Sequence, residues 1–108
     1  MDLTFIQFPG FAREWKRFRL CDEDLQALEA VLLDNPEAGA VMAGTGGVRK
    51  VRFSPPSRRS GKSGAYRVGY AYIRVADMVV FVTIFAKSDK GNLTAAEQAT
   101  IKKAVEFF

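Results

Sequence analysis

The alternation of apolar and polar residues predicts a short β-strand and then a helix at the start of the chain. Residues 3–8 (LTFIQF) are rich in strand-forming side chains, and Pro9 with Gly10 ends that run. Residues 11–18 then repeat aromatic side chains at helical spacing, with Trp15 in the middle. We interpret Trp15 as a core residue.

The clearest helical pattern starts at Asp22 and ends at Asn35 and Pro36. Asp22 can cap this helix. Apolar side chains recur at intervals of three or four through the segment: Leu25, Leu28, Val31 and Leu32. The acidic run from Asp22 to Asp24 is expected at a helix start because of the helix dipole, so we interpret it as structural and not as a metal site.

Three segments in the second half of the chain predict consecutive strands. Residues 48–53 alternate basic and apolar side chains, and residues 65–75 alternate large and small ones. Residues 78–86 are almost continuously apolar, which is typical of a strand buried on both faces. The segment 54–64 (SPPSRRSGKSG) has the composition of an exposed hairpin loop.

The end of the chain predicts one more helix. Thr94 followed by Glu97 matches a capping box, and Asn92 is an alternative cap. The element order is then β-α-α-β-β-β-α. Short connections favour antiparallel pairing of consecutive strands, with the helices over one face of the sheet. We therefore expect a single α+β domain over residues 1–108, a small antiparallel sheet packed against helices.

Composition narrows the possible functions. The chain has 108 residues, of which 48% are hydrophobic, enough for one compact core. Neither an apolar run of about 20 residues nor a basic signal-peptide start occurs, so we expect a cytoplasmic protein without a membrane segment. Histidine is absent and Cys21 is the only cysteine, which excludes an internal disulfide, a thiolate metal cluster and a Cys–His pair. We expect no metal and no cofactor.

Positive charge is concentrated in the middle of the chain. The net charge of +4 is moderate for a domain of this size. Residues 41–76, however, contain no acidic residue and eight basic ones: Arg49, Lys50, Arg52, Arg58, Arg59, Lys62, Arg67 and Arg74. This distribution, more than the total charge, points to an anionic partner.

A meander of the three strands would bring several of these bases together. Lys50 and Arg52 should share one face of their strand, with Arg67 and Lys87 nearby. Such like charges repel, which favours binding of an anion. The competing interpretation is that the bases form the solvated side of a half-exposed sheet, and the missing acidic residues favour binding over it.

Basic side chains alone can support cleavage of RNA. Attack by the neighbouring 2′-hydroxyl needs a base, cationic stabilisation of the crowded phosphorus and a proton for the leaving oxygen. Arginine suits bidentate phosphate contact, and lysine acts as a base where burial or neighbouring positive charge lowers its pKa.

Three segments carry a resemblance to a known family. Residues 44–53 (GTGGVRKVRF), 65–72 (AYRVGYAY) and 79–90 (VVFVTIFAKSDK) resemble RelE/HigB-family toxins of type II toxin-antitoxin systems, most closely the HigB-type subgroup. The resemblance extends to residues 34–39 (DNPEAG) and 93–97 (LTAAE), and the order of the motifs carries it. It implies a RelE-like fold and a ribosome-dependent endoribonuclease that cuts mRNA in the A site and so inhibits translation.

The resemblance also implies partners and site residues. The partners are the ribosome with its mRNA and a cognate antitoxin that often has a DNA-binding module. The expected catalytic residues are Arg67, Lys50, Arg52, Lys62, Lys87 and Lys90. Arg67 holds the scissile phosphate, Lys50 or Lys62 activates the 2′-hydroxyl, and Lys87 or Lys90, where many relatives have an arginine, assists the leaving group. The expected RNA-binding residues are Arg49, Arg58, Arg59 and Arg74.

Two other functions remain open from the sequence. One is a noncatalytic module that holds RNA or the ribosome on the same basic face. The other is a structural or interaction domain whose apolar patches matter, and its binding would depend only weakly on salt.

Overall fold

The computed structural model describes residues 2–58, 65–87 and 92–108 and shows an α+β fold. Its elements are β1 (Thr4–Gln7), α1 (Pro9–Arg17), α2 (Asp22–Asp34), β2 (Ala40–Val41), β3 (Arg49–Phe53), β4 (Tyr66–Ile73), the 3-10 helix η2 (Arg74–Ala76), β5 (Met78–Ala86) and α3 (Ala95–Val105). The predicted class and element order are confirmed, with a short extra strand, β2, and the 3-10 helix η2 added. No helix in the described part is long and apolar enough to cross a bilayer.

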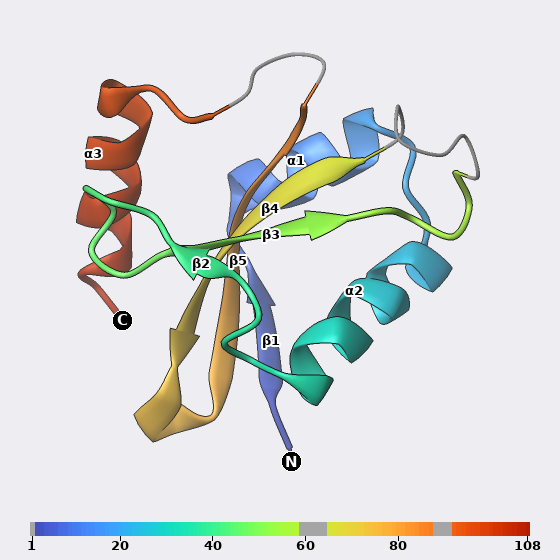
Figure 1. The fold of residues 1–108 in the computed structure, drawn as a ribbon, viewed down its shortest axis with the longest axis horizontal. Helices are drawn as coiled ribbons and strands as arrows, with labels where there is room; N and C mark the ends of the chain where they lie inside the picture. The colour runs from blue at the N-terminus through green and yellow to red at the C-terminus, as the bar shows by residue number, and fades with distance from the viewer. Residues whose placement is uncertain (1, 59–64, 88–91) are drawn as a thin grey trace.

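The five strands form one sheet in the order β1-β5-β4-β3-β2 (Figure 1). The strands β3, β4 and β5 form the predicted antiparallel meander. The strand β1 instead pairs in parallel with β5, so the sheet is mixed and the expectation of a wholly antiparallel sheet is corrected. Two helices separate β1 from the next strand, which frees β1 from hairpin pairing and lets it join the buried strand β5.

Helices cover both faces of the sheet, not one. On one face, Phe11 of α1 and Leu28 of α2 pack against Tyr70 and Phe81 of the central strands. On the other face, α3 packs through Ile101 over an apolar strip of the sheet. The reason is the continuous apolar run of β5, which needs cover on both sides (Figure 1).

Side chains cap the starts of α2 and α3. Thr94 caps α3, and its hydroxyl accepts from the Glu97 amide while the Glu97 carboxylate accepts from the Thr94 amide, as predicted. The cap of α2, in contrast, is Cys21 and not Asp22, which is already helical. The reason is Asp24, whose carboxylate reaches back and accepts from the Cys21 amide at 3.0 Å.

The segment between α2 and β3 is bound to the sheet by a buried tyrosine. The Tyr70 hydroxyl donates to the Pro36 carbonyl at 2.8 Å and accepts from the Gly39 amide at 3.0 Å. Burial raises the pKa of this hydroxyl, which therefore stays protonated and able to donate. Gly39 is required here, since a Cβ would lie 2.7 Å from the Lys50 carbonyl oxygen. These contacts place β2 beside β3 at the edge of the sheet.

Candidate nucleic-acid interface

Three basic side chains project from the sheet face that carries α3. On β3, Phe53 faces the α1–α2 layer and is buried against it. Lys50 and Arg52 alternate with Phe53 along the strand, so they lie on the other face of the sheet. On β4, Arg67 lies directly across from Arg52, and Lys50 lies across from Gly69. Directly opposed side chains have Cβ atoms about 4.5–5.5 Å apart. The predicted grouping of Lys50, Arg52 and Arg67 on one side is confirmed, and we call these three residues the basic face.

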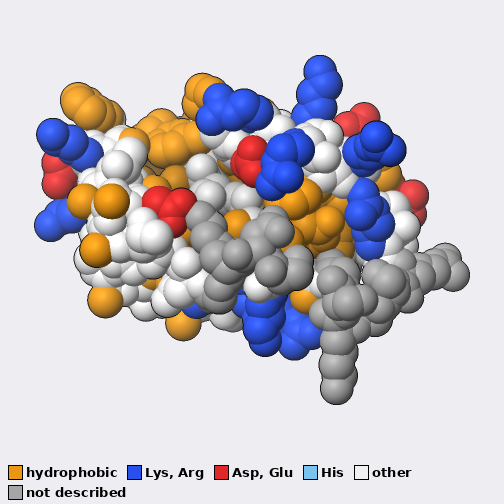
Figure 2. Space-filling view, turned by 90° about the horizontal axis from the view of Figure 1, so that it is seen from above, with side chains coloured by type: hydrophobic (Ala, Val, Ile, Leu, Met, Phe, Trp, Pro, Cys, Tyr) orange, Lys and Arg blue, Asp and Glu red, His pale blue; other side chains and the backbone are white. Residues whose placement is uncertain are grey.

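The basic face carries no compensating negative charge within the described ranges. Lys50 Nζ donates to Asn92 Oδ1 at 3.4 Å, and the Arg67 guanidinium has only a long contact, 3.4 Å, to the main-chain oxygen of Tyr66. None of the three forms an ion pair with a described carboxylate. Figure 2 shows more Lys and Arg side chains (blue) than acidic ones (red) on the side of the molecule that it views. Opposed like charges destabilise a sheet, so the arrangement favours an anionic ligand.

The strand β5 borders the basic face on its other side. Phe85 lies directly across from Arg67, and Thr83 lies across from Gly69. A Cβ at position 69 would lie 2.8 Å from Thr83 Cγ2, so only glycine fits between the two strands here. Lys87 is exposed and directly follows β5, where this strand pairs with the start of β4. The structure therefore brings Lys87 to the same end of the sheet as Arg67.

Other predicted residues are not brought to the basic face. Arg49 alternates to the opposite side of β3, where it forms an ion pair with Glu37 at 3.1 Å. The Arg58 guanidinium donates to the Phe18 carbonyl. Arg74 follows the far end of β4, roughly 20 Å from Arg67 at the rise of an extended strand. Their predicted contact with RNA would require surfaces beyond the basic face.

Three predicted residues, Arg59, Lys62 and Lys90, lie outside the described residues. Their roles stay predictions.

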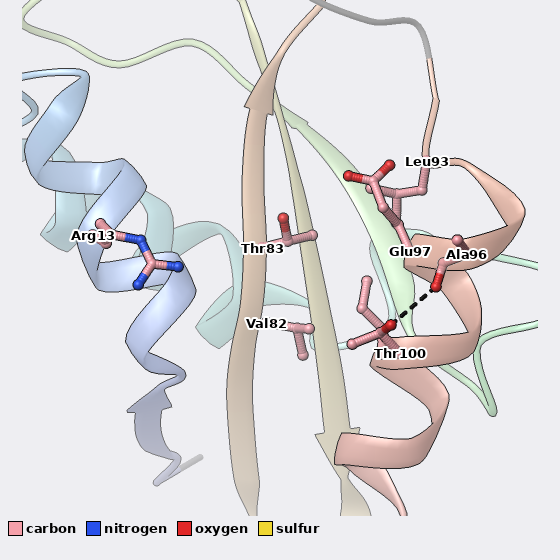
Figure 3. Close-up of a pocket in the computed structure, with 8 residues that line it drawn as sticks. Arg13, Val82, Thr83, Leu93, Ala96, Glu97 and Thr100 are labelled. Carbon is pink, nitrogen blue, oxygen red and sulfur yellow. Dashed lines mark hydrogen bonds between the residues drawn. The ribbon is translucent and has the colours of Figure 1, made fainter.

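Beside the basic face runs a groove that the sequence did not indicate. It consists of two adjoining hollows of about 440 and 410 Å³. Both are lined by Arg13 from α1, Val82 and Thr83 from β5, and Glu97 from α3. We call it the β5 groove. Figure 3 shows Arg13 and Glu97 on opposite sides of β5, with Thr83 between them.

The β5 groove results from the short length of β1. The strand β1 pairs only with Met78–Phe81, and beyond that point the chain turns into α1. The next stretch of β5 contains a β-bulge, because Gly69 pairs with Thr83 while Tyr70 pairs with Phe81, which leaves Val82 between them. Bulges are frequent beside active sites, where they redirect a side chain. The sequence signal for the groove is weak, because Arg13 stands on the polar side of a helix and the pattern around Glu97 predicts only a helix cap.

Comparisons with known proteins agree with this architecture. Residues 7–108 match the family model described as RelE toxin of the RelE/RelB toxin-antitoxin system. A doubly substituted E. coli toxin RelE in the free state shares 18% identity over 93% of this chain and 96% of that one, with a TM-score of 0.58. The E. coli RelBE toxin-antitoxin complex contains a chain 19% identical, covering 79% of this chain and 96% of that one, with a TM-score of 0.55. At such low identities, the likeness to the two solved structures supports the fold alone. The family model covers most of the sequence and therefore shows the family. The HigB-type subgroup stays a prediction. The chain belongs to the RelE toxin family.

Proposed function

We propose that this toxin cleaves mRNA in the ribosomal A site by attack of the 2′-hydroxyl on the adjacent phosphate, without a metal ion. The observation that carries the proposal is the opposition of Arg52 and Arg67, beside Lys50, with no carboxylate partner among the described residues. A phosphate between these groups would relieve the repulsion and accept several charge-assisted hydrogen bonds. Membership of the RelE toxin family supports the same assignment.

Each basic residue has a role in this scheme. Arg67, with Arg52 opposite, holds the scissile phosphate and stabilises the charge that develops on it. Lys50, half-buried beside them, removes the 2′-hydroxyl proton when its side chain is the neutral amine, and becomes the ammonium in doing so. The oxygen attacks phosphorus, the bond to the 5′-oxygen breaks, and Lys87 gives a proton to that leaving oxygen. The alternative assignments to Lys62 and Lys90 stay open.

We also propose a cognate antitoxin as the partner that neutralises the toxin. One of the matched structures is an intact RelBE toxin-antitoxin complex. An antitoxin that covers the basic face would need acidic or apolar contacts there, and a DNA-binding module would allow it to regulate its own expression. Because translated mRNA is the proposed substrate, the proposed location is the cytoplasm.

The proposal is tested by inducing the wild type and Arg67→Ala in cells and mapping mRNA 5′ ends by primer extension. Arg74→Ala is the matched control, since it removes the same charge from η2, beyond the far end of β4 and away from the basic face. Wild type and Arg74→Ala should produce cuts within translated codons, and Arg67→Ala should produce none while remaining folded. Cuts that persist in a folded Arg67→Ala would remove this residue from the mechanism.

A second outcome would change the function itself. Growth arrest without any new 5′ ends would identify a binding inhibitor that occupies RNA or the ribosome through the basic face. Loss of arrest in Arg67→Ala would then still assign the binding to that face.

A further inference from the structure

The lining of the β5 groove combines three kinds of surface. Its floor is apolar and includes Val82, Leu93 and Ile101, all buried. One wall carries the guanidinium of Arg13, and the other carries the carboxylate of Glu97 (Figure 3). The larger hollow, about 440 Å³, lies within the range of about 300–1,000 Å³ typical of small-molecule sites. The groove can therefore hold a ligand of nucleotide size.

Arg13 is the cation available in this groove. It is exposed, and no carboxylate or carbonyl in the described part of the chain forms an ion pair or hydrogen bond with it. Its neighbour one turn later, Arg17, differs because it pairs with Glu14 at 2.8 Å. A guanidinium without a partner above a hollow is suited to bind a phosphate group.

The groove is continuous with the basic face through one residue. Phe85 lines the groove and lies directly across from Arg67 in the sheet. Neighbouring strands lie about 4.8 Å apart, so a chain of nucleotides held at Arg67 needs to cross only β5 to reach Arg13. Single-stranded RNA is recognised by phosphate contacts combined with unstacked bases, whose faces stack on aromatic side chains and whose edges form hydrogen bonds.

Glu97 decides which kind of ligand fits. A simple phosphate would be repelled by its carboxylate, whereas a nucleotide can place its phosphate at Arg13 and its base toward Glu97. The Glu97 carboxylate already accepts from the Thr94 amide through Oε1. A carboxylate has several acceptor lone pairs, so it can also accept from the exocyclic amino group of cytosine, adenine or guanine, and uracil has none. We infer that the β5 groove is a subsite for the nucleotide next to the scissile phosphate and favours bases that carry an amino group. This inference rests on the proposed function.

Direct binding tests the subsite without depending on cleavage. Fluorescent 2′-O-methyl oligonucleotides of A, C or U cannot be cut by 2′-hydroxyl attack, and their affinity is measured by anisotropy at several salt concentrations. The variants are Arg13→Ala and Glu97→Gln, the second of which keeps an oxygen to accept from the Thr94 amide. Lys103→Ala is the control, since Lys103 is exposed on α3 and does not line the groove.

The two variants should change different quantities. Arg13→Ala should weaken all three oligonucleotides and reduce the salt-dependence slope by about one. Glu97→Gln should reduce the preference for C over U by about fivefold or more, the lower limit for loss of a direct base contact. Lys103→Ala should retain the base preference of the wild type. Scoring the base beside each cut on translated mRNA extends the test to a toxin that engages RNA only on the ribosome.

The outcomes separate this inference from the proposed function. A wild type that cuts mRNA, with affinity and base preference unchanged in both variants, would overturn the subsite and leave the cleavage intact. A wild type that binds RNA with the predicted preference but never cuts would support the subsite and refute the cleavage. If Arg13→Ala and Glu97→Gln bind RNA as the wild type does but are no longer neutralised by the antitoxin, the groove is a binding site for the antitoxin. That result would overturn the inference.

Discussion

The hydroxyl of Ser57 donates to the buried carboxylate of Asp24 at 2.6 Å, and the Ser57 amide donates to the same group at 3.0 Å. Asp24 also accepts from the amide and the thiol of Cys21. One side chain thus joins the start of α2 to the chain that leaves β3. The strand β3 carries two of the three basic-face residues. The Asp24–Ser57 hydrogen bonds, which we call the Asp24 joint, therefore hold the chain just after β3 in place.

Asp24 should make the fold sensitive to acid. Burial alone would raise the pKa of Asp24, but the hydrogen bonds from Ser57 and Cys21 outweigh it and hold the pKa below its ordinary value of 3.8. The resulting stability is present above the unfolded-state pKa and is lost as the pH falls through the folded-state pKa. Asp24→Asn should lower the free energy of unfolding at pH 7 by about 1.5–3 kcal/mol, and stability should then depend less on pH below about 5. Urea denaturation across this pH range measures both effects.

Ser57→Ala is the control for this joint. It removes one donor and keeps the carboxylate, so it should cost less than Asp24→Asn and keep most of the acid sensitivity. An Asp24→Asn variant as stable as the wild type at pH 7 would show that the joint does not stabilise the fold.

The opposition of Arg52 and Arg67 should cost stability. Arg67→Gln should raise the free energy of unfolding by about 0.2–1 kcal/mol, because it removes one of two like charges at directly opposed positions. The same variant should lose RNA cleavage. Thermal melts at low salt measure the stability of Arg67→Gln, with Arg74→Gln as a control that should be as stable as the wild type. If Arg67→Gln is less stable than the wild type, repulsion between Arg52 and Arg67 is not the dominant effect.

The buried hydroxyl of Tyr70 should contribute to the edge of the sheet. Tyr70→Phe leaves the Pro36 carbonyl and the Gly39 amide without their partner, which should cost about 1–3 kcal/mol. In Tyr70→Phe, the amides of residues 36–41 should exchange faster than they do in the wild type, and this increase should be larger than that of the β5 amides. Equal protection of that segment in the wild type and the variant would contradict the prediction.

The close approach of Gly69 and Thr83 can be tested by a compensating pair. Gly69→Ala places a methyl group 2.8 Å from Thr83 Cγ2 and should destabilise the fold by about 1–3 kcal/mol. Thr83→Ser removes that Cγ2 and keeps the hydroxyl, so the double variant should regain most of the loss. A double-mutant cycle without coupling would show that the clash lies elsewhere.

Local patterns predicted most of the fold because its elements follow local rules. The apolar run 78–86 coincides with β5, and the three- and four-residue spacing from Leu25 to Leu32 lies within α2. The two-residue strand β2 has no pattern of its own, since its position depends on contacts with Tyr70 and Arg49. The parallel pairing of β1 with β5 joins distant segments, and local alternation does not report such a partner.

The basic face was predictable and the groove beside it was not. Alternation along β3 and β4 suffices to place Lys50, Arg52 and Arg67 on one side, and the same alternation sends Arg49 to the other. The β5 groove depends on where β1 stops and on the bulge at Val82. Both are properties of the assembled sheet, and so Arg13 and Glu97 were assigned only to their own helices.

The parallel pairing of β1 with β5 also sets the order in which the protein can assemble during its synthesis. Thr4 pairs with Met78, so the first strand leaves the ribosome about seventy residues before its partner exists. The strand β5 lies between β1 and β4, and without it the first strand has no neighbour and Arg67 has no Phe85 beside it. A nascent or truncated chain that ends before β5 therefore lacks an inner strand of the sheet, and the surroundings of Arg67 can form fully only after β5 has been synthesised.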